Sequence, residues 1–209
     1  MPTSLPVAAV LLALEAQLAS EAWSLPEVWR VGCLASRART DPSYPHFVVV
    51  LYNPANDAAL SLLRSFEAAG GTAKVQIRPL EARTPQEIEA AVVLAARERA
   101  EALVWVVDSP LILQQAQIAE LGASHRLPPL AGHPSYPDVG GLIGYGPNRK
   151  DLSKRVAIYL DKIFNGADPR EVPLQQPAKL DLVINRKTAK ALGLTIPSEL
   201  VLLADRVIE

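Results

Sequence analysis

The sequence has little of the chemistry that marks several common classes of protein. It contains a single cysteine, Cys33, so it forms no internal disulfide and holds no cysteine-based zinc cluster. Its three histidines lie far apart and lack the spacing of a metal-binding helix, so we expect no metal. Lys and Arg number 21 against 22 for Asp and Glu, a formal charge of -1, which indicates no basic surface for nucleic acid or an anionic membrane.

Motifs of common enzymes and cofactor-binding proteins are also missing. The sequence has no GxSxG, GxxxxGK[ST] or GxGxxG motif. The glycine-rich GGLIGYG, residues 140–146, does not have the spacing of a phosphate-binding loop. His133 and Asp108 would make an acid–base pair, but no nucleophile stands at a defined spacing from them. We therefore expect no cofactor and no catalysis.

The N-terminal region allows two interpretations. The run Leu5–Leu14 is apolar but too short to span a bilayer, and small residues follow it, as in a signal peptide. However, the first basic residue is Arg30 and Glu15 ends the apolar run, which also fits an ordinary amphipathic helix. Residues 1–22 are thus a signal peptide or an N-terminal helix. The first interpretation predicts a periplasmic or extracellular, membrane-associated protein, and the second a cytoplasmic one.

Strands and helices are expected to alternate from residue 47 onward. The β-branched and aromatic run FVVVLY (47–52) is typical of a strand buried on both faces of a parallel sheet. We expect the helix that follows it to end at Gly70 and Gly71. Further strands are expected at 72–80, 101–107 and 127–134, with helices at 85–100 and 111–126 between them. This alternation predicts an α/β lobe with a doubly wound parallel sheet.

Two segments carry clear local signals. The first marks the start of a helix: Thr84 is the N-cap, Pro85 takes the first helical position and Glu87 is the capping-box partner. Towards the C-terminus we expect a short strand in GGLIGYG, a helix ended by Gly166, a long extended segment at 174–185 and a helix ended by Gly193. Pro177 lies within the extended segment, which suits an edge or crossover strand.

Polar residues that follow the predicted strands are the candidate ligand-binding residues. Ligands of open α/β sheets bind beyond the carboxyl ends of the strands, where the strand order reverses. If the strand order is 2-1-3-4, Asn53 after the first strand faces Asp108 after the third, and Asn56 and Ser109 lie beside them. Asx turns and a helix cap would also explain the asparagines, and capping of the next helix would explain Asp108. The group is suited to hydrogen-bonding a small polar ligand, and Tyr145 is a candidate aromatic wall.

Several motifs resemble one family. Three segments carry the resemblance: VVVLYNPAND, RVAIYLDKIFNGADP and VINRKTAKALGLTIP. They are similar to segments of the ABC-transporter substrate-binding protein family that includes the tryptophan/aromatic amino acid type. The resemblance covers residues 47–209. The resemblance implies two α/β lobes of the periplasmic-binding-protein type I-like fold, which close on a small ligand and deliver it to an ABC permease. It also implies ligand contacts for Asn53, Asn56, Asp108, Ser109 and Tyr145.

The same resemblance predicts a missing lobe. VWRVGCLAS (28–36) resembles the first strand of a first lobe, yet the second lobe already begins at residue 47. About 100 residues, by typical domain size, would then be absent. We therefore expect a first-lobe remnant at 27–46, a complete second lobe at 47–140, and hinge crossover strands, a first-lobe-type helix and the C-terminal segment at 141–209.

Two functions remain open from the sequence. The first is a truncated substrate-binding component of an ABC importer, which binds a small polar or amino-acid-like ligand without catalysis. The second is a single-lobe interaction or regulatory module, or a non-transporting remnant of the family. Exposed first-lobe remnants would leave apolar surface uncovered, so a homodimer formed through them is also expected.

Overall fold

The computed structural model describes residues 3–4, 46–73, 75–173, 177 and 179–209. The predicted signal peptide or N-terminal helix at 1–22 and nearly all of the predicted first-lobe remnant at 27–46 lie outside the described residues. Both interpretations of the N-terminal region therefore stay predictions.

A seven-stranded sheet forms the centre of the described part of the chain, in the order β3-β2-β4-β5-β6-β7-β9. Its strands are β2 (His46–Tyr52), β3 (Val75–Glu81), β4 (Ala102–Trp105), β5 (Pro129–Ala131), β6 (Ile143–Pro147), β7 (Leu180–Asn185) and β9 (Arg206–Ile208). Every neighbouring pair is parallel except β6 and β7. The predicted α/β class is confirmed, and the first four strands of the sheet have the order 2-1-3-4 on which the site hypothesis depended.

Helices connect the parallel strands and continue into the C-terminal part. They are α2 (Asp57–Ala73), α3 (Pro85–Arg97), α4 (Ser109–Leu113), α5 (Gln115–Ser124), the 3-10 helix η2 (Tyr136–Val139), α6 (Arg149–Phe164), α7 (Arg186–Ala191) and α8 (Ser198–Leu203). A separate two-stranded sheet pairs β1 (Thr3–Ser4) in parallel with β8 (Leu194–Thr195). No helix among the described residues is long and apolar enough to cross a membrane.

The sheet has a hydrophobic core on each face because successive residues of β2 point to opposite sides. Val48 and Val50 pack into one core with residues of α2, and Val49 and Leu51 pack into the other with residues of α3 and α5. All four side chains are at most 2 % exposed. The strand is therefore buried on both faces, as its continuous apolar run predicts.

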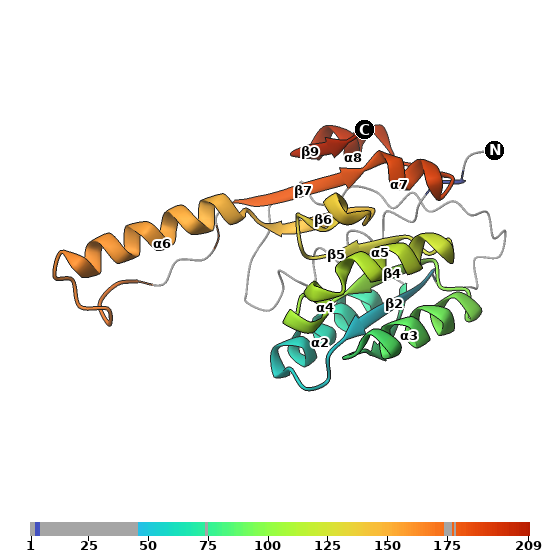
Figure 1. Cartoon of the computed structure of the whole chain (residues 1–209), viewed down its shortest axis with the longest axis horizontal. Helices are drawn as coiled ribbons and strands as arrows, with labels where there is room; N and C mark the ends of the chain where they lie inside the picture. Colours follow the sequence, from blue (N-terminus) through green and yellow to red (C-terminus); the bar gives the residue numbers. More distant parts are fainter. Residues whose placement is uncertain (1–2, 5–45, 74, 174–176, 178) are drawn as a thin grey trace.

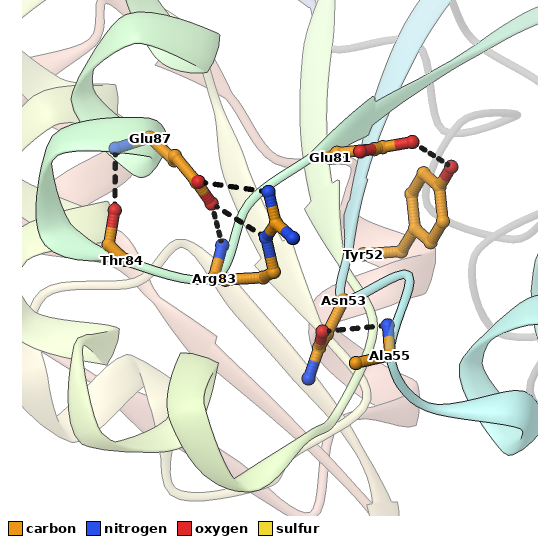
Figure 2. Close-up of polar contacts among 7 residues, drawn as sticks. All are labelled: Tyr52, Asn53, Ala55, Glu81, Arg83, Thr84 and Glu87. Atoms are coloured by element: carbon orange, nitrogen blue, oxygen red, sulfur yellow. Dashed lines mark hydrogen bonds and ion pairs between the residues drawn. The ribbon is translucent and has the colours of Figure 1, made fainter.

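The start of α3 follows its sequence signal closely. Thr84 Oγ1 accepts a hydrogen bond from the backbone N–H of Glu87 at 3.2 Å, and Pro85 is the first helical residue. The Glu87 carboxylate in turn accepts from the backbone N–H of Arg83 at 2.7 Å and from its guanidinium (Figure 2). These bonds from Arg83 hold the pKa of Glu87 below its ordinary value. In a standard capping box the glutamate would accept from the N–H of the N-cap residue, Thr84. Here it accepts from the N–H of the preceding residue, Arg83.

The prediction that α2 ends at its two glycines is wrong. The helix continues through Gly70 and Gly71 to Ala73. A Cβ atom at Gly70 would lie 2.7 Å from Ile77 Cγ1 and 2.8 Å from the backbone oxygen of Val75. Gly70 therefore allows the last turns of α2 to approach β3 closely, which is a packing requirement and not a stop signal.

Two further expectations need correction. The helix predicted at 111–126 is divided, because the N–H of Gln114 bonds to the carbonyl of Leu111 in a tight turn that ends α4 before α5 begins. Pro177 does not lie within a strand, since β7 starts only at Leu180. A proline has no N–H to donate to the ladder, so the strand forms after it.

Helix α6 extends away from the rest of the described molecule (Figure 1). Asn148 caps its start by accepting from the N–H of Asp151 at 2.8 Å, and Gly166, with a φ of 94°, follows its end. None of its residues is buried. Val156 and Leu160, one turn apart, are 55 % and 46 % exposed, and Phe164, another turn on, is 82 % exposed. An amphipathic helix with such a stripe normally packs it against another surface.

An ion pair joins η2 to the C-terminal strand. Arg206 donates to both carboxylate oxygens of Asp138, at 2.6 and 2.8 Å, and these bonds hold the pKa of Asp138 below its ordinary value. Because the folded-state pKa is lowered, the pair contributes stability above the unfolded-state pKa and loses it as the pH falls through the folded-state value.

Replacing Asp138 by asparagine is expected to lower the free energy of unfolding by about 0.5–1 kcal/mol at pH 7, since the pair is half exposed. The difference between the parent protein and Asp138→Asn should shrink as the pH falls below about 4, and should vanish only below the lowered folded-state pKa, where both states are protonated. Urea unfolding at a series of pH values measures it, with Glu89→Gln on the exposed face of α3 as control. A difference at pH 3 as large as the one at pH 7 would contradict this account.

Candidate functional site

Polar side chains from the carboxyl ends of β2 and β4 meet beyond the edge of the sheet. Asn53 Nδ2 donates to Asp108 Oδ2 at 2.5 Å, and Asn56 Nδ2 donates to Asp108 Oδ1 at 3.0 Å. The backbone N–H of Ser109 donates to the same Oδ1 at 2.9 Å. The two strands are direct neighbours in the sheet. Four of the five predicted site residues are thus brought together, as the strand order requires.

The same residues also hold the local backbone. Asn53 Oδ1 accepts from the N–H of Ala55 at 3.0 Å (Figure 2), and Asn56 Oδ1 accepts from the N–H of Ala58 at 3.0 Å. Asp108 is the N-cap of α4. The turn and cap roles are therefore real. They do not compete with ligand binding, because they fix the amides and the carboxylate in place.

The negative charge of Asp108 has no positively charged partner in the described part of the chain. Within the described ranges no lysine, arginine or histidine forms an ion pair with Asp108. Its partners are two neutral amides and a backbone N–H. Asn53 is 8 % exposed, whereas Asp108 is partly exposed and Ser109 is exposed. The edge therefore presents an accessible carboxylate whose charge no cation of the described chain neutralises.

Residues at the end of β3 extend this edge. The Tyr52 hydroxyl donates to Glu81 Oε1 at 3.3 Å, and Arg83 lies just beyond, paired with Glu87 (Figure 2). Burial, with the nearby Glu81 charge, raises the pKa of Tyr52, so the phenol stays protonated and can donate. Sequence reasoning did not single out Glu81 or Arg83. The strand-end rule applied to β3 would have found both.

Tyr145 lies apart from the hydrogen-bonded group. It belongs to β6, two strands from β4 in the sheet, and its side chain is only 3 % exposed. It packs in the same core as Val48 and lies opposite Leu182 of β7. Burial raises the pKa of its phenol to about 12. In this arrangement the ring is a core residue at the antiparallel pair of the sheet.

The site contains donors and acceptors but no reactive group at a defined geometry. Asp108 is a carboxylate held by amides, and Ser109 contributes a backbone N–H to it. Over the described ranges, no group of three or more His, Cys, Asp or Glu side chains is arranged to hold a metal ion. Chemically, this arrangement can accept hydrogen bonds from a small molecule and balance a positive charge on it.

A doubly wound lobe with polar residues gathered at the carboxyl edge of its sheet is typical of α/β proteins that bind ligands at that edge. Its family follows from the sequence: the family model described as "ABC transporter substrate binding protein" matches residues 45–208. The chain belongs to the ABC transporter substrate-binding protein family. The resemblance of its motifs to that family is thereby confirmed.

Solved structures of similar fold support the periplasmic-binding-protein-like architecture. A conserved domain protein from Vibrio cholerae shares 21 % identity at a TM-score of 0.72, over 78 % of this chain and 55 % of the other. A Streptococcus pneumonia ABC domain in complex with L-Trp shares 22 % identity at a TM-score of 0.72, with the same coverage. A substrate binding protein with adhesive properties from Clostridium difficile, in a ligand-free, open form, shares 17 % identity at 0.61, again covering 78 % and 55 %.

The chain spans about half the length of these solved proteins, 55 % in each case. No curated protein has a significantly similar sequence. At these identities the likeness establishes the fold.

Proposed function

We propose that the chain is a truncated substrate-binding component of an ABC importer, which binds a small polar or amino-acid-like ligand without catalysis. The observation that carries this is the Asp108 carboxylate, held by Asn53 and Asn56 and lacking a cation partner in the described chain. Such a carboxylate suits a ligand with an ammonium group. The complex of a related fold with L-Trp, an amino acid, supports this ligand class.

The proposal includes the expected division of the chain. The second lobe would occupy 47–140, and 141–209 would supply the hinge crossover strands and a first-lobe-type helix, with Tyr145 at the hinge. The extent of the family match, from residue 45, and the half-length coverage of the solved proteins support a missing first lobe. Export to the periplasm, by a signal at residues 1–22, and delivery to an ABC permease belong to the same proposal.

Thermal unfolding in the presence of amino acids and small carboxylates tests the ligand class. A ligand at one hundred times its Kd is expected to stabilise the protein by about 2.7 kcal/mol, which raises Tm by roughly 5–10 °C. Asp108→Asn keeps the shape of the side chain but removes its charge, and it should abolish the shift. Glu120→Gln, on the exposed face of α5, is the matched control and should keep it. A shift that survives in Asp108→Asn would place the ligand elsewhere.

The second candidate function is an interaction module, and α6 favours it. Val156, Leu160 and Phe164 form an exposed apolar stripe on this first-lobe-type helix. Two copies of the chain would form the expected homodimer by packing such stripes together. Leu160→Asp is then expected to convert a dimer into a monomer, measured by sedimentation velocity. Lys154→Asp, elsewhere on the same helix, should leave the dimer intact. A parent protein that is monomeric at high concentration would exclude this candidate.

A further inference from the structure

A cavity lies in the C-terminal part of the chain, away from Asp108. It is formed by α7, β8 and α8 and has a volume of about 960 Å³. The strand that leads into α7, β7, is three positions from β4 in the sheet order. The proposed amino-acid site does not involve any of its residues.

Apolar side chains form much of this cavity. Leu194 and Ile196 line it and also pack against the hydrophobic core, while Val201 and Leu202 line it from α8. Leu202 is 85 % exposed. Contact of these side chains with an alkyl chain would remove apolar surface from water, which favours binding.

The charged side chains that line the cavity are mostly positive. Arg186, Lys187 and Lys190 line it against the single carboxylate of Glu209, so three positive side chains face one negative. Arg186 is already paired with Glu209 at 2.6 Å. In the part of the chain that the structure describes, neither Lys187 nor Lys190 has an ion pair or a side-chain hydrogen bond. Two cations are therefore available beside an apolar surface.

We propose that this cavity binds an amphipathic anion, a molecule with an alkyl chain of medium length that ends in a carboxylate. The chain lies against Leu194, Ile196 and Leu202, and the carboxylate pairs with Lys187 and Lys190. Charge complementarity selects an anion over a cation or a neutral alcohol. This site is independent of the proposed function, because none of its lining residues belongs to the group around Asp108.

Isothermal titration of the full chain with decanoate, below the concentration at which it forms micelles, tests the proposal. We expect saturable binding that the double variant Lys187→Gln/Lys190→Gln weakens about ten-fold or more, because charged hydrogen bonds are lost. Lys150→Gln/Lys154→Gln, which removes two cations from α6, is the matched control and should bind as the parent does. Decyltrimethylammonium should not bind at the cavity.

Three outcomes would overturn the proposal. One is the absence of saturable decanoate binding, and another is equal binding of the cationic amphiphile. The third is that decanoate does not bind and the parent chain self-associates in a way that Leu202→Asp abolishes. The cavity would then be an interface between two copies of the chain. Loss of decanoate binding in Lys187→Gln/Lys190→Gln with an unchanged amino-acid response would separate this site from the one at Asp108.

Discussion

Trp105→Ala is expected to lower the free energy of unfolding by about 3–5 kcal/mol, the cost of removing a large aromatic side chain from a core. Trp105 ends β4, a strand with neighbours on both sides, and is completely buried. Its ring meets that of Tyr136 edge to face, with centroids 5.2 Å apart and an angle of 87° between planes. This contact joins the sheet to η2, so the substitution would leave a cavity between two elements and remove a favourable aromatic pair.

Urea unfolding followed by far-ultraviolet circular dichroism measures this effect without depending on tryptophan fluorescence. Trp105→Phe is the control, because it keeps a ring against Tyr136 and should cost clearly less than alanine. A loss below about 1 kcal/mol for Trp105→Ala would mean that β4 and η2 do not pack as described. If the alanine variant does not fold, the phenylalanine variant still tests the direction of the effect.

Gly144→Ala is expected to destabilise the protein by about 3 kcal/mol, at the upper end of the cost of overpacking a core. Gly144 lies in β6, between β5 and β7. A Cβ atom there would lie 2.3 Å from the backbone oxygen of His133 and 2.7 Å from Pro137 Cδ. A backbone atom and a proline ring cannot rotate away, so the strand or the loop after β5 would have to move.

Gly71→Ala provides the matched comparison, since a Cβ atom at Gly71 meets nothing within 4 Å and the residue lies in α2. It should stabilise the protein by about 0.5–1 kcal/mol through the higher helix propensity of alanine. The same chemical change is thus predicted to have opposite signs at two positions, as judged from urea midpoints. Similar destabilisation at both positions would contradict the close approach at Gly144.

Much of the lobe was predictable because its signals are local or follow one topological rule. The continuous apolar run of β2 predicts burial on both faces, and Thr84 with Pro85 predicts the start of α3. The order 2-1-3-4 then places Asn53 beside Asp108, fifty-five residues later in the chain, and the structure shows them in contact.

The remaining features depend on distant contacts that no local pattern encodes. Gly70 looks like a helix stop in the sequence, but its role is set by Ile77, which reaches it only when α2 packs on β3. The pairing of Asp138 with Arg206 joins residues sixty-eight positions apart and depends on where β9 adds to the sheet. Tyr145 was singled out as an aromatic wall in a hinge strand; its packing in the core opposite Leu182 depends on the register of β6 with β7, which the local sequence does not encode.

The hydrogen bonds already made by Asp108 limit how a ligand can meet it. A carboxylate offers about four accepting positions, two on each oxygen. Asn56 and the Ser109 N–H occupy both positions on Oδ1, and Asn53 occupies one on Oδ2. A single lone pair on Oδ2 is left, which in the proposed site would accept one N–H of an ammonium group. The paired N–H groups of a guanidinium need two free oxygens side by side, so the proposed site would favour a lysine-like or α-amino nitrogen over an arginine-like one before any second lobe contributes.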